Sequence, residues 1–84
     1  MANNVTWEVE KHLGTLYTTI RGRRAEEGWS KQVNIVSWNG GVAKIDIRDW
    51  NEDMTRMSKG ITLSKEEARE VMTILKGWFE EGEE

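Results

Sequence analysis

Aromatic, amide and charged side chains recur at alternate positions in two segments of this chain, residues 29–38 and 42–49 with Trp50 directly after them. The even-numbered positions are Gln32, Asn34, Val36, Trp38, Lys44, Asp46, Arg48 and Trp50. Residues two apart in a strand project from the same face of a sheet, so these side chains are predicted to share one surface. Bases of a single-stranded nucleic acid stack on indole rings, and Lys or Arg neutralise the phosphates between them. The pattern therefore predicts a surface that binds single-stranded nucleic acid.

A structural interpretation of the aromatic residues competes with this one. Trp7, Trp78 and Phe79 follow the phase of their apolar neighbours, which favours a place in the core. Trp38 and Trp50 are out of phase with the apolar positions, which favours exposure and binding. Part of their face could instead be a dimer interface, where Trp is also enriched.

Charge is distributed unevenly along the 84 residues, although the net charge is −3. Residues 11–48 hold seven basic and three acidic side chains, whereas residues 64–84 hold three basic and seven acidic ones. The basic body can therefore bind nucleic acid if the acidic C-terminal segment lies away from the strand. A chain of this size buries only about 64% of its unfolded surface, so dimerisation would stabilise it.

Several classes of protein are excluded by what the sequence lacks. Without cysteine it has no disulfide, thiol nucleophile or Cys-based zinc site. No apolar run approaches the roughly 20 residues of a membrane span, and residues 1–4 have neither the basic nor the apolar region of a secretory signal. We therefore expect no membrane partner and a cytoplasmic location.

A calcium site is the first alternative for the acidic residues. Asp49, Asn51 and Asp53 have the spacing that opens a calcium-binding loop. The sixth position of that loop is Met54 rather than Gly, and the twelfth is Gly60 rather than Glu. No metal site is therefore predicted.

Catalysis is the second alternative, and the sequence does not support it. His12 is the single histidine, so a zinc site or a Ser–His relay lacks its other members. Asp46 and Asp49 could act as paired carboxylates, but Asp46 lies between Lys44 and Arg48, which favours an orienting ion pair. We expect no enzyme, no cofactor and no small-molecule substrate.

The elements that position these residues follow from the hydrophobic periodicity. Alternation predicts four strands, at residues 5–20, 29–38, 42–49 and 60–63, with loops at 21–28 and 50–59. In the first strand Val5, Trp7, Val9 and Leu13 are predicted to point inward. After Gly14 the phase of the apolar residues inverts, which predicts a β-bulge there.

The two middle strands are predicted to form a hairpin through Asn39-Gly40-Gly41. Odd-numbered positions are apolar on both strands, and a three-residue loop pairs odd positions with odd ones. The resulting cross-strand pairs are Val36 with Lys44, Asn34 with Asp46, and Gln32 with Arg48. The apolar odd face is then expected to pack on a helix.

That helix is predicted at residues 65–79. Ser64 and Glu67 form a capping box at its start. Apolar residues follow at helical spacing: Ala68, Val71, Met72, Leu75, Trp78 and Phe79. Residues 80–84 are an acidic tail.

Three segments carry a resemblance to a known family: residues 36–39 (VSWN), 44–50 (KIDIRDW) and 57–64 (MSKGITLS). They resemble the transcriptional coactivator positive cofactor four family, and most of all its bacterial YdbC-type branch. The resemblance extends over about residues 5–78, nearly the whole chain.

The resemblance implies an α+β fold, in which a four-stranded curved antiparallel sheet is followed by one helix, and a homodimer. It also implies sequence-tolerant binding of single-stranded DNA. The positions that it assigns to the strand are Trp29, Lys31, Asn34, Trp38, Lys44, Arg48, Trp50 and Lys59. The dimer contacts fall on Val71, Met72, Leu75 and Trp78 of the helix. The alternation of the strand places Lys31 on the opposite face, so the two arguments differ there.

Together these observations predict one domain, residues 1–79, with an acidic tail at 80–84. It is expected to be a homodimeric, non-enzymatic protein that binds single-stranded DNA in transcription regulation or DNA maintenance, in the cytoplasm and associated with the nucleoid. One alternative is single-stranded RNA in the same groove. The other is a protein-interaction module that uses the exposed Trp residues.

Overall fold

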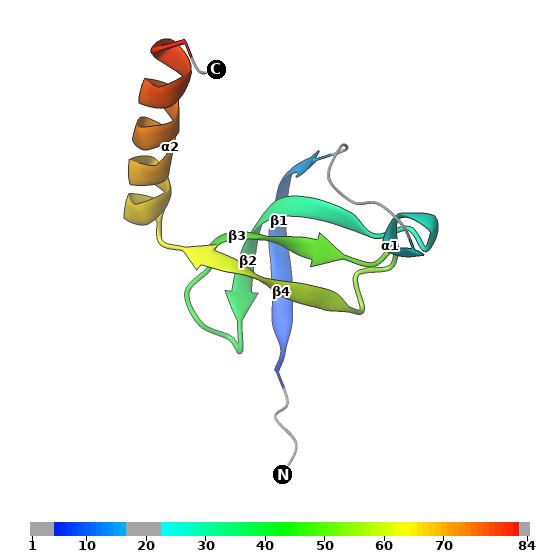
Figure 1. Cartoon of the computed structure of the whole chain (residues 1–84). Helices are drawn as coiled ribbons and strands as arrows, with labels where there is room; N and C mark the ends of the chain where they lie inside the picture. The colour runs from blue at the N-terminus through cyan, green and yellow to red at the C-terminus, as the bar shows by residue number, and fades with distance from the viewer. Residues whose placement is uncertain (1–4, 17–22, 83–84) are drawn as a thin grey trace.

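Four antiparallel strands and a C-terminal helix make up the fold, as shown by a computed structural model that describes residues 5–16 and 23–82. The elements are β1 (Trp7–Leu16), α1 (Arg23–Glu26), β2 (Ser30–Trp38), β3 (Lys44–Trp50), β4 (Met57–Leu63) and α2 (Lys65–Glu80) (Figure 1). The strands are neighbours in chain order, β1-β2-β3-β4. The predicted α+β class is therefore confirmed. Within the described part of the chain, no helix has the length and apolarity to cross a membrane.

The segments predicted as loops, 21–28 and 50–59, both contain regular structure. The segment 21–28 contains the short helix α1, and β4 begins at Met57, three residues before the predicted start. Because Ser58 and Lys59 are polar, the hydrophobicity pattern does not predict the first residues of this strand. Met57 nevertheless pairs with Trp50. Residues 17–20 of the predicted first strand lie outside the described residues.

The pairing of β2 with β3 confirms the predicted register. Gln32 lies opposite Arg48, Asn34 opposite Asp46, and Val36 opposite Lys44. The loop itself is different. Asn39 and Gly40 both have positive φ, 52° and 74°, and the Gly41 N–H donates to the Trp38 carbonyl at 2.8 Å. This is a two-residue turn rather than the predicted three-residue loop. Residues 41–43 after it do not pair with β2, and this offset keeps odd-numbered positions opposite odd-numbered ones.

The pairing of β1 with β2 is irregular at two places rather than one. The register shifts between Val9 and Lys11 and again between His12 and Gly14. The predicted bulge beside Gly14 is thus observed, but the first shift was not foreseen. Because of these two shifts, the prediction that Leu13 points inward is wrong, and its side chain is exposed.

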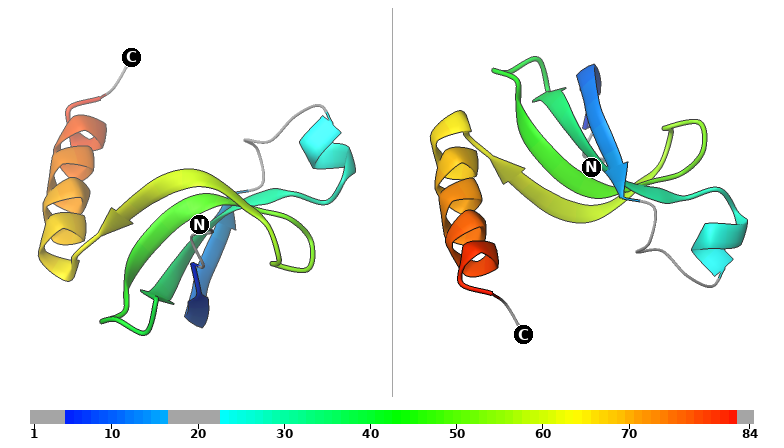
Figure 2. Two further views of the ribbon diagram at one scale, coloured as in Figure 1. Left: turned by 90° about the horizontal axis from the view of Figure 1, so that it is seen from below. Right: turned by 90° about the horizontal axis from the view of Figure 1, so that it is seen from above.

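The most buried residues lie on the face of the sheet that carries the polar residues. Asn34, Val36, Asp46 and Trp50 are fully buried, whereas the apolar residues of the opposite face are only half-buried. Figure 2 shows that the sheet is strongly curved and that no second layer covers it. Curvature brings the side chains of the inner face together, so this is the concave face. The apolar odd-numbered face is convex.

Helix α2 begins as predicted but buries none of its residues. The Ser64 hydroxyl accepts from the Glu67 N–H at 3.1 Å, and the Glu67 carboxylate accepts from the Ser64 N–H at 2.9 Å, which confirms the capping box. The helix then extends away from the sheet (Figure 1). The prediction that Trp78 and Phe79 are core residues is wrong within this chain, because the helix carries them past the sheet and they are 52% and 58% exposed.

An open apolar groove separates α2 from the convex face. Its lining residues are Ile45, Ile47, Leu63, Ala68, Val71, Met72, Leu75 and Lys76. The predicted packing of the helix on the odd-numbered face is therefore incomplete, because the two surfaces meet only along a short contact.

Candidate nucleic-acid interface

Three tryptophans from three strands meet on the concave face. The Trp7 ring lies 6.4 Å from the Trp38 ring and 5.8 Å from the Trp50 ring, centroid to centroid. Trp7 shares this face because it pairs directly with Trp38 across β1 and β2. The sequence pattern predicted Trp7 in the core and Trp38 on the exposed face. Alternation defines the two faces of each strand but does not show which face of one strand continues which face of the next.

The expected exposure of Trp50 is wrong. Its side chain is 0% exposed, and it forms the centre of the small core together with Val36. The indole N–H groups of Trp38 and Trp50 are buried and have no hydrogen-bond partner among the described residues. In this arrangement the half-buried Trp38, which lines a recess, offers the accessible indole surface, whereas Trp50 is fully enclosed.

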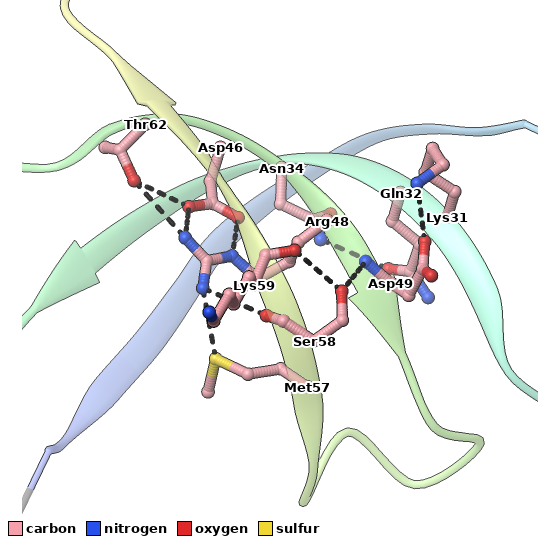
Figure 3. A network of polar contacts seen from close by, with 10 residues as sticks. All are labelled: Lys31, Gln32, Asn34, Asp46, Arg48, Asp49, Met57, Ser58, Lys59 and Thr62. Carbon is pink, nitrogen blue, oxygen red and sulfur yellow. Dashed lines mark hydrogen bonds and ion pairs between the residues drawn. The ribbon is translucent and has the colours of Figure 1, made fainter.

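Arg48 is held in place by a buried carboxylate (Figure 3). Its Nε donates to Asp46 Oδ1 at 2.6 Å and its Nη2 to Asp46 Oδ2 at 2.7 Å. The Thr62 hydroxyl donates to the same carboxylate at 2.9 Å. The guanidinium carbon lies 4.5 Å from the Trp38 ring centroid. The predicted orienting ion pair is confirmed, and it places the guanidinium over the indole ring.

A chain of amide hydrogen bonds runs along the same face. The amide oxygen of Asn34 lies 2.6 Å from His12 Nδ1, and the Asn34 amide donates to Gln32 Oε1 at 3.1 Å. The Gln32 amide donates to the Ser30 hydroxyl at 3.0 Å. Asn34 is thus buried and fully engaged, which suits a positioning role. The first register shift of β1, between Val9 and Lys11, pairs His12 with Asn34 and so brings it to this face, which alternation along the strand does not predict.

Lys31 and Trp29 belong to a different cluster. Lys31 Nζ forms an ion pair with Asp49 at 2.8 Å, and Arg24 reaches the same carboxylate at 3.6 Å. The Arg24 guanidinium also covers the Trp29 ring at 4.5 Å. Lys31 lies on the convex face, as alternation within β2 predicted. The structure therefore does not bring these two residues into contact with the concave cluster.

Lys44 is an exposed cation at the start of β3, and Lys59 is an exposed cation within β4. Among the residues that the structure describes, neither forms an ion pair. An unpaired, solvated ammonium group can exchange counterions for a phosphate at little cost. These two lysines are exposed positive charges on two of the strands that form the concave face.

A recess of about 470 Å³ opens on this face, lined by Val5, Trp38, Arg48, Met57 and Thr62. Its wall combines an aromatic ring, a fixed guanidinium and apolar side chains. Such a surface can hold a flat, partly polar molecule by stacking and by hydrogen bonds at its edge. No group of three or more His, Asp or Glu side chains gathers in a metal-binding arrangement within the described ranges.

A curved sheet that presents stacked aromatic and cationic side chains, with a helix beside it, is typical of a small nucleic-acid-binding protein. Comparison with known families agrees: the model of the Transcriptional Coactivator p15 (PC4) family matches residues 25–74. The chain belongs to this family, whose members bind nucleic acid and are not enzymes.

A relative is found in Treponema pallidum (strain Nichols), an uncharacterized protein that is 41% identical over 61 residues. The match covers 73% of this chain and 65% of the relative. The chain thus spans less than two thirds of the length of that protein.

Proposed function

We propose that this protein is a homodimer that binds single-stranded DNA along its concave sheet faces, with most contacts independent of sequence. The role would lie in transcription regulation or DNA maintenance, in the cytoplasm and at the nucleoid. The observation that carries the proposal is the recess in which the partly exposed Trp38 ring lies against the Arg48 guanidinium. Family membership supports nucleic acid as the partner.

The dimer is supported by the unburied apolar face of α2. Val71, Met72, Leu75 and Trp78 are all exposed, although they lie on one side of the helix. Exposed apolar area costs about 25 cal/mol per Å² relative to its burial, and a small chain cannot leave this much surface uncovered without an effect on stability. A second copy of the chain would cover both this face and the groove beside it.

The dimer is tested by Met72→Glu, with Arg69→Glu on the polar side of α2 as the matched control. Light scattering after gel filtration should give a dimer mass for the native chain and the control. It should give a monomer mass for Met72→Glu. A native chain that remains monomeric at all concentrations would refute the dimer.

DNA binding is tested by a fluorescence titration of the Trp residues with a dT oligomer of about 20 nucleotides at several salt concentrations. We expect quenching and a negative slope of log K against log salt, since each phosphate contact to a single strand contributes about −0.7. Lys44→Ala or Lys59→Ala should each reduce the slope by about 0.7. Lys65→Ala, an exposed lysine at the start of α2, is the control and should not.

The same titration separates the alternatives. Tighter binding of a U oligomer than of the matching T oligomer would assign the groove to RNA. No quenching and no binding at low salt would refute the proposal and favour a protein partner for the exposed surfaces.

A further inference from the structure

We propose that the recess beside Trp38 receives one base of the bound strand, and that Arg48 reads the edge of this base and favours guanine. This inference rests on the proposed binding of single-stranded DNA. It concerns one position of the strand, whereas the other contacts remain independent of sequence.

The first argument is the charge of Arg48. Its guanidinium forms two short hydrogen bonds with Asp46, and its own side chain is only 13% exposed. The Asp46 side chain is 0% exposed, so the pair is close to electrically neutral within the sheet. A phosphate that took Arg48 away would leave a buried carboxylate without a partner, which is strongly unfavourable. Arg48 is therefore expected to keep its ion pair with Asp46 when the strand binds, so that only its outer edge is available to the ligand.

The second argument is the edge of the guanidinium that remains available. Nε and one side of Nη2 are engaged by Asp46 (Figure 3). The outer edge, formed by Nη1 and Nη2, has only long contacts: 3.5 Å to Met57 Sδ, 3.4 Å to the Ser58 carbonyl and 3.4 Å to the Thr62 hydroxyl. The two contacts to oxygen are longer than the usual N–H···O hydrogen bond, and the Met57 thioether sulfur is a weak acceptor. A better acceptor at the recess could replace all three contacts.

Guanine supplies the acceptors that fit this edge. Its O6 and N7 are adjacent and accept two parallel hydrogen bonds from an arginine. Adenine presents an amino donor beside N7, which would face the guanidinium donors. Thymine has the N3–H donor between its two carbonyl acceptors, whereas cytosine offers O2 and N3 as an adjacent pair of acceptors and is the second base that this edge could accept. The outer edge of Arg48 therefore discriminates most strongly between the two purines.

The third argument is the stacking surface. The Arg48 guanidinium lies 4.5 Å from the Trp38 ring centroid. The Trp38 ring also lines the recess, so a base that accepts hydrogen bonds from the outer edge of Arg48 enters beside the indole ring. Val5 and Met57 complete the apolar wall of the recess. Stacking and edge recognition are thus available to the same base.

The first experiment uses the native protein and four oligomers of nine nucleotides. The host is all adenine, and the central position is adenine, guanine, 7-deazaguanine or an abasic site. We expect guanine to bind about tenfold more tightly than adenine, as for a bidentate arginine contact. Removal of N7 in 7-deazaguanine should abolish most of this gain. Equal affinity for guanine and adenine would overturn the inference, whereas no binding of any oligomer would refute the proposed function itself.

The second experiment separates base reading from phosphate contact. Arg48→Lys keeps a cation beside Asp46 but removes the planar fork. We expect it to eliminate the preference for guanine and to leave the salt slope unchanged. Lys44→Ala is the matched control, and it should reduce the slope by about 0.7 while the tenfold preference remains. A reduced slope with an intact preference in Arg48→Lys would identify a phosphate contact instead. If Arg48→Lys does not fold, the oligomer series on the native protein still decides.

Discussion

At Gly60, the addition of a single methyl group is expected to displace Arg48 and so disturb the geometry of the site. It lies on β4 directly opposite Arg48 of β3. A Cβ atom built at this glycine would collide with the Cβ and Nε of Arg48 and with the backbone carbonyl of Ile47. The carbonyl cannot rotate away as a side chain could. The absence of a side chain at Gly60 therefore allows the Arg48 side chain to lie against β4 while it pairs with Asp46.

The effect of Gly60→Ala can be estimated from these contacts. In an unhindered strand, alanine in place of glycine stabilises a protein by about 0.5–1 kcal/mol. Here overpacking costs about 1–3 kcal/mol, and displacement of Arg48 from the buried Asp46 sacrifices part of an ion pair whose complete disruption costs about 3–5 kcal/mol. We expect a net loss of about 2–4 kcal/mol in the free energy of unfolding.

The assay is urea unfolding followed by Trp fluorescence, at one protein concentration for all variants. Gly77→Ala is the matched control, because nothing lies within 4 Å of a Cβ at this helical position. It should stabilise the protein by about 0.5–1 kcal/mol through helix propensity. The two substitutions are chemically identical and should have opposite signs. A Gly60→Ala variant that is as stable as the native protein would refute this account of the site.

Three further predictions follow from the same geometry. Trp50→Ala should cost about 3–5 kcal/mol in unfolding free energy because the side chain is fully buried. Trp50→Phe should cost less, since the indole N–H has no hydrogen-bond partner to lose among the described residues. A cost below about 1 kcal/mol for Trp50→Ala would place this ring at the surface in solution. Asp49→Asn should release Lys31 from its ion pair but leave the salt slope for DNA binding unchanged, because Lys31 lies on the convex face; a slope steeper by about 0.7 would show that Lys31 contacts the strand. Hydrogen bonds from Thr55 lower the pKa of Asp53 below its usual value of 3.8. Their stabilising effect is present above pH 3.8 and is lost as the pH falls through the lower folded value; an NMR titration of the Asp53 carboxyl should give a midpoint below 3.8 that rises in Thr55→Ala.

The sequence by itself determined the elements that depend on local rules. The strands β2 and β3 follow from alternation, and their register follows from the requirement that apolar positions share a face. The start of α2 follows from the capping box at Ser64 and Glu67, which satisfies the free N–H groups of the first turn. The ion pair of Asp46 with Arg48 also follows from local spacing, because residues two apart on a strand lie side by side.

Only the tertiary structure decided which face of the sheet is buried and which tryptophan is accessible. Alternation defines two faces but not the direction in which the sheet curves. The pairing of β1 with β2 brings Trp7 beside Trp38 and within 5.8 Å of the Trp50 ring, and the curvature closes this face around Trp50. In α2 the sequence predicted an apolar face correctly, but its partner is not the sheet of the same chain, so Trp78 remains exposed. Both outcomes depend on contacts between distant segments, which local periodicity does not encode.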